Sequence, residues 1–218
     1  MKKLVFVFVL VWIHSVLSGF AEGIVSPNKN FYFYDEVGVL SEETKGEIFF
    51  SNRLLYDDCG AQIVVVVINS TGSYSTEEYC IELFNQWGIG DAEKNNGFLL
   101  LLAIQDDDYY ACPGSGLESQ FPATMIKTMF DEYLENDFAV KQYDTGVRKF
   151  YEAAFAHIAE VNHSNVTIQD GIKAYENYKT EPLTVDIDLT KLSWNELLLL
   201  QQKIVEEMQN RLEPSMAE

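Results

Sequence analysis

The sequence predicts an α/β fold, namely a three-layer α/β/α sandwich whose central mixed sheet of about four to five strands carries helices on both faces. Two continuous apolar runs, 63–68 and 98–104, have the length and composition of strands that are buried on both faces. A helical pattern lies between them, and this strand–helix–strand order favours a parallel pair joined by a right-handed crossover. A small strand–helix extension is expected at the C-terminal end.

The first half of the domain contains clear start and stop patterns. An aromatic segment at 31–34 is the first expected strand. Ser41, followed by two glutamates, predicts the start of a helix that runs to about Tyr56. Ser75 begins a capping box with a glutamate three residues later, and Gly88 is expected to end this second helix in a left-handed conformation.

The second half begins with a hairpin. The aspartates at 106–108 predict a turn, after which 109–112 returns as an antiparallel partner of the second buried strand. Two further helices are expected at about 123–136 and 145–160, and the domain is expected to end near residue 160.

The two ends of the chain differ from this domain. Residues 1–21 have a basic start, an apolar core and small residues after it, which is typical of a secretory signal peptide. The mature chain is therefore expected to be exported to the extracellular space, the cell surface, the periplasm or a lumen, with no membrane-spanning segment of its own. Residues 161–180 are polar and predict a linker. Residues 181–218 combine an alternating strand pattern with a capped helix, and we expect a small docking extension there.

The charge balance restricts the partners. The chain has 15 basic and 34 acidic side chains, a formal net charge of −19. Such a field repels nucleic acid and anionic lipid, and it favours cations or basic partners. No nucleic-acid partner is therefore expected.

Three cysteines are present: Cys59, Cys80 and Cys112. An odd number permits one disulfide and one free thiol, with three possible pairings, and small buried apolar side chains are the alternative.

The hairpin predicts where polar side chains gather. The start of its first strand lies beside the end of its second, so Asn95 and Asn96 should lie close to Glu118. Asp91 and the Asp57–Asp58 pair are expected near the same edge. Carboxylate and amide oxygens suit Ca²⁺, or Mg²⁺ with more water retained. The alternative is a set of solvated loop acids.

Two other observations bear on function. Open α/β sheets bind ligands at the carboxyl ends of their parallel strands, which here is the opposite edge, beside 69–73 and 106–108. The aspartates of that turn are expected to be solvated. None of the common nucleophile, phosphate-loop or metalloprotease motifs is present, so no catalytic residue and no organic cofactor is assigned.

Over about 27–160 the residues resemble the TPM domain family. The matching segments come in the family's order: Asp-Glu-Val-Gly-Val-Leu-Ser at 35–41, Gly-Ala-Gln-Ile-Val-Val-Val-Val at 60–67, Glu-Tyr at 78–79, Leu-Phe-Asn-Gln-Trp-Gly-Ile-Gly at 83–90, Asn-Asn-Gly at 95–97 and Gly-Ser-Gly-Leu-Glu at 114–118.

The resemblance implies an α/β/α sandwich on the lumenal, periplasmic or extracellular side of a membrane. Family members are associated with Ca²⁺ binding in an acidic pocket, and weak acid phosphatase activity is attributed to some. Asp35, Asn95, Asn96 and Glu118 match the polar motif positions, and Asp35 enters the candidate pocket through the resemblance alone.

The sequence departs from the family pattern at three places. Asn95 stands where an Asp is usual, Cys112 and Pro113 replace an acidic–aliphatic pair, and Ser119 replaces a Gly. The loss of two carboxylates is expected to weaken cation binding.

Three functions follow as hypotheses. The first is an exported accessory module that binds a divalent cation and acts on membrane or envelope proteins. The second is a metal-dependent acid phosphatase of low activity, and the third is a metal-free protein-interaction domain. The sequence leaves open whether the protein is an enzyme.

Overall fold

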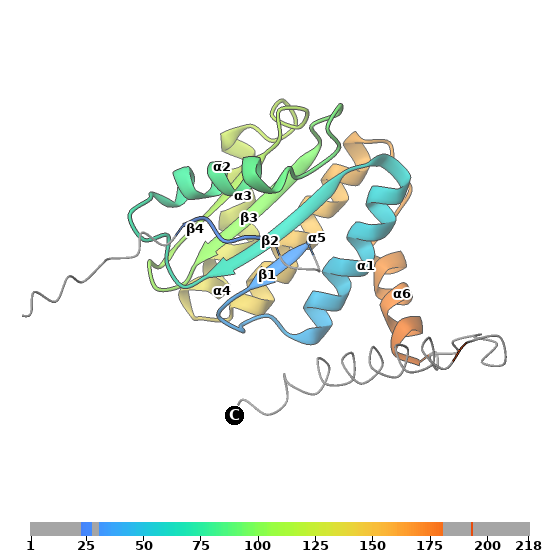
Figure 1. Ribbon diagram of the computed structural model, residues 1–218, viewed down its shortest axis with the longest axis horizontal. Coiled ribbons are helices and arrows are strands. Elements are labelled where there is room, and N and C mark those ends of the chain that lie inside the picture. The colour runs from blue at the N-terminus through green and yellow to red at the C-terminus, as the bar shows by residue number, and fades with distance from the viewer. Residues whose placement is uncertain (1–22, 28–30, 181–192, 194–218) are drawn as a thin grey trace, which may run out of the picture. The chain divides into compact units, whose positions relative to one another are not determined.

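The computed structural model describes residues 23–27, 31–180 and 193 (Figure 1). The expected signal peptide at 1–21 and the expected extension at 181–218, apart from Ser193, therefore lie outside the described residues. The elements follow in this order: β1 (Phe33–Asp35), α1 (Glu42–Cys59), β2 (Gln62–Ile68), α2 (Thr76–Trp87), β3 (Gly97–Ala103), β4 (Asp108–Pro113), α3 (Ala123–Met129), the π-helical turn η1 (Phe130–Leu134), α4 (Glu135–Ala139), α5 (Tyr143–Val161) and α6 (Ile168–Thr180).

Among the described residues the sheet has four strands in the order β1-β2-β3-β4. β1, β2 and β3 are parallel, and β4 is antiparallel to β3. All residues of β2 and β3 are buried, as the two apolar runs predicted. The mixed α/β fold is thus confirmed, with four strands in the sheet.

Helices cover both faces of this sheet (Figure 1). On one face, Val64 and Leu99 pack into a cluster with residues of α2. On the other face, Val65 and Leu100 pack into a larger cluster with α1, η1 and α5. Alternating residues of each buried strand therefore supply both cores, because successive strand side chains point to opposite faces.

The expected starts of α1 and α2 and the expected end of α2 are confirmed, whereas α1 runs to Cys59, beyond the expected end at about Tyr56. The Ser41 hydroxyl accepts a hydrogen bond from the Thr44 N–H at the start of α1. Ser75 and Glu78 form the capping box of α2. Gly88 ends α2 with φ 61°, a left-handed conformation that glycine adopts at low cost.

The segment at 161–180, expected to be a linker, instead contains helix α6. This helix packs on α1: the ring of Tyr175 lies over Gly46, and Gly171 abuts the Ser51 backbone. The Tyr175 hydroxyl also donates a hydrogen bond to the Glu42 carbonyl, at 3.0 Å. The helix is polar on most of its surface and depends on these few close contacts, so its sequence resembles that of a solvated segment.

None of the helices among the described residues combines the length and the apolar character needed to cross a membrane.

Candidate functional site at the edge of the sheet

The loop before β3 is organised by Asp91. One of its carboxylate oxygens accepts the backbone N–H groups of Glu93 and Lys94, both at 2.9 Å. These two donors lower the pKa of the Asp91 carboxyl below its ordinary value. Its carbonyl accepts the N–H of Asn95, which has φ 49°. Asp91 therefore shapes a tight loop, as an aspartate at a turn commonly does.

Asn96 is buried, with 2% of its surface exposed. Its side-chain amide donates to the Cys59 carbonyl at 3.3 Å and to the Asn162 side chain at 2.9 Å, and its oxygen accepts the Asp91 N–H at 3.1 Å. The side chain thus joins the end of α1, the β3 loop and the end of α5. These bonds occupy the groups that a cation would need, so Asn96 has a structural role.

The hairpin brings its two ends together as the sequence predicted. The Gly114 N–H donates to the Gly97 carbonyl at 2.8 Å, and the Gly116 N–H donates to the Asn95 carbonyl at 3.0 Å. A β-carbon on Gly116 would lie 2.0 Å from the Lys94 carbonyl oxygen. Glycine is required there because the two backbones are in direct contact.

Beside this contact is a pocket of about 500 Å³ at the outer edge of β4. Its apolar walls come from the C-terminal half of α2, from β4 and from the start of α3, and Glu118 is its one charged lining residue. The carboxylate of Glu118 accepts no hydrogen bond from the described residues. The lining residues are Ile81, Phe84, Asn85, Asn95, Tyr110, Ala111, Cys112, Pro113, Gly114, Ser115, Glu118, Phe121, Ala123 and Ile126.

Tyr110 joins one wall of the pocket to α2. Its hydroxyl donates a hydrogen bond to the Glu77 carboxylate at 2.9 Å. Burial, together with this carboxylate, raises the pKa of Tyr110 to about 12. The phenol therefore stays protonated at neutral pH and holds Glu77 beside the pocket.

The outer side of β4 has unpaired backbone groups, which the sequence did not predict. Because Gly114 pairs with Gly97 through a hydrogen bond, strand alternation directs the N–H and C=O of Ala111 away from β3. No residue in the described part of the chain forms a hydrogen bond with them. Ala111 also lines the pocket, so a strand edge and an apolar pocket coincide.

Asp35 lies elsewhere. It ends β1 opposite Val67, whereas the hairpin edge is level with Gln62, which pairs with Gly97. Five strand residues separate the two levels, about 16 Å along the sheet. The structure therefore does not place Asp35 in one pocket with Asn95, Asn96 and Glu118.

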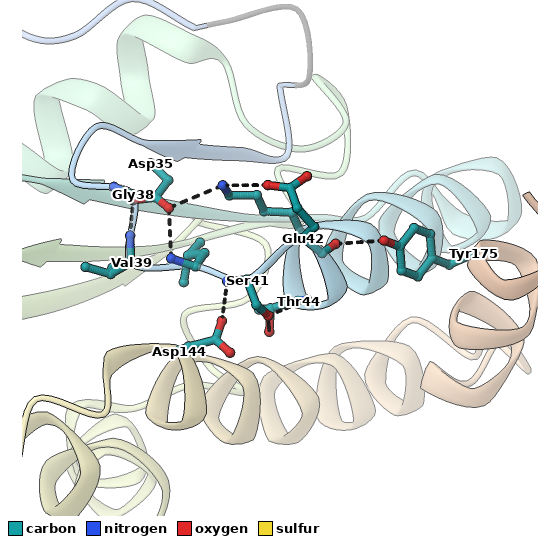
Figure 2. A network of polar contacts seen from close by, with 10 residues as sticks. Asp35, Gly38, Val39, Ser41, Glu42, Thr44, Asp144 and Tyr175 are labelled. Carbon is teal, nitrogen blue, oxygen red and sulfur yellow. Dashed lines mark hydrogen bonds and ion pairs between the residues drawn. The ribbon is translucent and has the colours of Figure 1, made fainter. Parts of the chain in front are cut away.

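Asp35 organises the loop between β1 and α1 instead (Figure 2). Its side chain is 2% exposed, and its oxygens accept the N–H groups of Gly38, Val39 and Leu40. The Lys45 ammonium lies 3.6 Å away. This buried carboxylate is fully engaged in holding the loop.

The aspartates at the opposite edge are exposed, as expected, and two of them also accept hydrogen bonds from the neighbouring loop. Asp106 accepts the Thr71 N–H at 2.8 Å and the Ser70 hydroxyl at 2.8 Å. Asp108 accepts the Thr76 hydroxyl at 2.5 Å. They fasten the hairpin turn to the loop before α2.

The fold and the site define a class of protein: an α/β sandwich domain with an apolar pocket at the edge of a mixed sheet. The model of the TPM domain matches residues 33–157, more than half of the chain and all four strands. The chain belongs to the TPM domain family.

Three solved structures are similar to this chain, and the first of them agrees with this fold. The N-terminal domain of a protein from P. gingivalis is 23% identical, with a TM-score of 0.55 over 61% of this chain and 85% of that chain. The BA42 protein of Bizionia argentinensis is 15% identical, with a TM-score of 0.47 over 59% of this chain and 92% of that one. The N-terminal domain of the cg2496 protein of Corynebacterium glutamicum is 14% identical, with a TM-score of 0.45 over 61% and 85%. No curated protein matches the chain at a significant level.

Proposed function

We propose that this TPM domain is an accessory binding module that captures an extended segment of a partner protein along the outer edge of β4. The observation that carries this proposal is that the unpaired N–H and C=O of Ala111 coincide with an apolar pocket, although Ala111 itself is only 3% exposed. An added strand forms main-chain hydrogen bonds with such an edge, and pockets beside it select alternate side chains. The expected signal peptide suggests that the partner is a membrane or envelope protein.

The chemistry of the pocket indicates the partner's side chains. Ile81, Phe84 and Ile126 supply apolar walls, and Glu118 supplies a carboxylate with no partner among the described residues. Glu77 adds a second negative charge next to Tyr110. A segment that alternates apolar and basic residues complements this surface, and the net charge of −19 favours its approach.

The probe is a synthetic octapeptide of alternating Val and Lys, titrated into the ¹⁵N-labelled protein. We expect saturable shifts of the amide signals of β4, with the Ala111 signal among the largest. The Glu118→Gln variant should bind about 2- to 5-fold more weakly, because an exposed ion pair contributes modestly. Shifts confined to another surface would contradict the proposal.

The matched variant is Ala111→Pro. Proline lacks the outward N–H, so peptide binding should be lost. Because Ala111 is 3% exposed, the amide spectrum of the variant is first compared with that of the wild type, and retained binding by the folded variant would contradict the proposal. Glu93→Gln removes an acidic side chain outside the pocket and should leave binding unchanged. An octapeptide of alternating Val and Glu should not bind. Equal binding of the acidic peptide would overturn the charge argument.

A second candidate is a weak Ca²⁺ site in the same pocket, supported by the shared position of Glu118, Asn95 and Ser115. One carboxylate with two neutral oxygens is a small ligand set, so we expect a dissociation constant of about 0.1–1 mM or weaker. Calorimetric titration with CaCl₂ should give heat that Glu118→Gln abolishes and Glu93→Gln retains. Absence of heat at millimolar Ca²⁺ would remove the metal from the proposal.

The phosphatase alternative has less support from the site. Binding a phosphoester requires cationic groups, and none of the residues that line the pocket is Lys or Arg. The nearby Lys94 donates to the Cys59 carbonyl at 2.8 Å and so already has a structural partner. We therefore favour binding over turnover.

A further inference from the structure

Two of the three cysteines lie face to face between α2 and β4. The sulfur atoms of Cys80 and Cys112 are 3.0 Å apart, although 32 residues separate them in the chain. Cys80 is fully buried, and Cys112 is 8% exposed. Cys59 is also buried, but it lies at the end of α1, where its thiol contacts the Leu55 carbonyl.

We propose that Cys80 and Cys112 form a disulfide bond that joins α2 to β4, and that Cys59 remains the free thiol. A disulfide needs a sulfur–sulfur distance of about 2.0 Å, so closure moves the two sulfur atoms together by about 1 Å. Small side-chain rotations supply a shift of this size. The structure thus selects one of the three pairings that the sequence allowed.

The oxidant required is a disulfide of the glutathione class. The thiolate of one cysteine attacks it, forms a mixed disulfide and releases one glutathione thiol. The second cysteine then attacks the mixed disulfide and releases the other glutathione. Two thiols and one glutathione disulfide thereby become one protein disulfide and two glutathione molecules, and the two protons of the cysteines end on the released thiols.

The folded environment determines when this exchange takes place. Burial and the neighbouring Cys112 thiol raise the pKa of Cys80 well above its ordinary value. The thiolate is therefore scarce once the domain has folded, and exchange is expected during folding while the pair is still accessible. After folding, the same burial protects the bond from reductants.

The bond would lie in the wall of the pocket. Cys112 lines the pocket directly, and Ile81, the residue after Cys80, lines it from α2. The disulfide would thus fix the distance between the helix and the edge strand on two sides of the binding pocket. This inference does not depend on which ligand the pocket binds.

The test refolds the reduced, denatured protein in a mixture of oxidised and reduced glutathione. We expect a product two hydrogen atoms lighter than the reduced protein, with one cysteine alkylated after denaturation instead of three. Peptide mapping should recover the Cys80 and Cys112 peptides as one linked species. The Cys59→Ala variant should give the same bond and no alkylated cysteine.

Comparison of the oxidised and reduced wild-type protein avoids any effect of a substitution on folding. The oxidised form should melt about 5–15 °C higher, because the cross-link restricts the unfolded chain. Three alkylated cysteines, a bond that includes Cys59, or a persistent mixed disulfide with glutathione would overturn the proposal.

Discussion

Asn95 and Asn96 are adjacent in the chain and have different roles. Asn95 is exposed, adopts φ 49° and lines the pocket. Asn96 is buried and connects three segments through its side-chain amide. The sequence predicted the turn at this pair, because Asn tolerates positive φ, but it gave the two residues the same expected role as metal ligands. Burial distinguishes them.

We expect Asn96→Ala to lower the free energy of unfolding by about 2–3 kcal/mol. The substitution removes the acceptor of the Asp91 N–H and the donor to the Asn162 side chain at a buried position, and unsatisfied groups carry most of such a cost. Urea unfolding followed by far-UV circular dichroism measures it. Asn95→Gly is the matched control and should change stability little, because glycine accepts positive φ. Equal effects of the two substitutions would contradict the assigned roles.

Asp91 should contribute to the pH dependence of stability. Its pKa is lowered in the folded protein by the backbone N–H groups of Lys94 and Glu93. The stabilisation is therefore present above the unfolded pKa of about 3.9 and is lost as the pH falls through the lower, folded pKa. Asp91→Asn should be less stable than the wild type at pH 7, and the difference should shrink as the pH falls below about 4.

Urea unfolding at a series of pH values between about 7 and 2 measures this difference. Glu93→Gln removes an exposed carboxylate of the same loop that accepts no hydrogen bond from the described residues. This control should not reproduce the pH-dependent difference. A difference in the free energy of unfolding between the wild type and Asp91→Asn that persists unchanged at low pH would exclude the carboxylate as the source of that difference.

At the scale of elements, the strands and most helices are specified locally, whereas α6 depends on contact with α1. The apolar runs of β2 and β3, the Ser41 cap of α1 and the capping box of α2 are visible in short windows of sequence. α6 instead has few apolar residues, and its position depends on Gly171 and Tyr175 meeting Ser51 and Gly46. The prediction of a linker at 161–180 was wrong. Contacts between segments over a hundred residues apart leave no periodic pattern in the sequence.

Gly171→Ala should displace α6 without unfolding the sheet. A β-carbon at residue 171 would lie 2.4 Å from the Ser51 β-carbon and 2.6 Å from its α-carbon, and that backbone cannot rotate away. Alanine is about 1 kcal/mol more favourable than glycine inside a helix. Weaker protection of α6 from hydrogen exchange in this variant would therefore have to come from the clash. Hydrogen exchange should show faster exchange in 168–178 and unchanged exchange in β2 and β3. Gln169→Ala, at an exposed position of the same helix, should leave both unchanged.

At the scale of the molecule, the acidic excess opposes compactness. A net charge of −19 produces repulsion among surface carboxylates, and salt screens it over a Debye length of about 10 Å at 0.1 M. We expect the melting temperature to rise by a few degrees between about 20 and 200 mM NaCl. A melting temperature that stays constant or falls would contradict this account.

CaCl₂ at matched ionic strength provides the control for this experiment. A further rise with Ca²⁺ that Glu118→Gln removes would come from the proposed cation site, since a ligand that binds only the folded state stabilises it. An equal rise of the melting temperature in the wild type and in Glu118→Gln would come from screening alone.

The sequence by itself determined the order and type of the elements from β1 to α5, except that the helix expected at about 123–136 is divided into α3, η1 and α4. It also determined the closure of the hairpin that brings Asn95 beside Gly114–Glu118, and the resemblance to the TPM family. These features depend on hydrophobic period, caps and turn residues, which act within a few positions of the chain. Only the tertiary structure decided that Asp35 lies at the other edge, that Asn96 is buried, that the edge of β4 opens into a pocket, and that Cys80 faces Cys112. Each of these depends on the direction and register of strands or on the packing of distant segments. Local sequence does not encode those relations, because the energies that fix them come from contacts formed when the chain is folded.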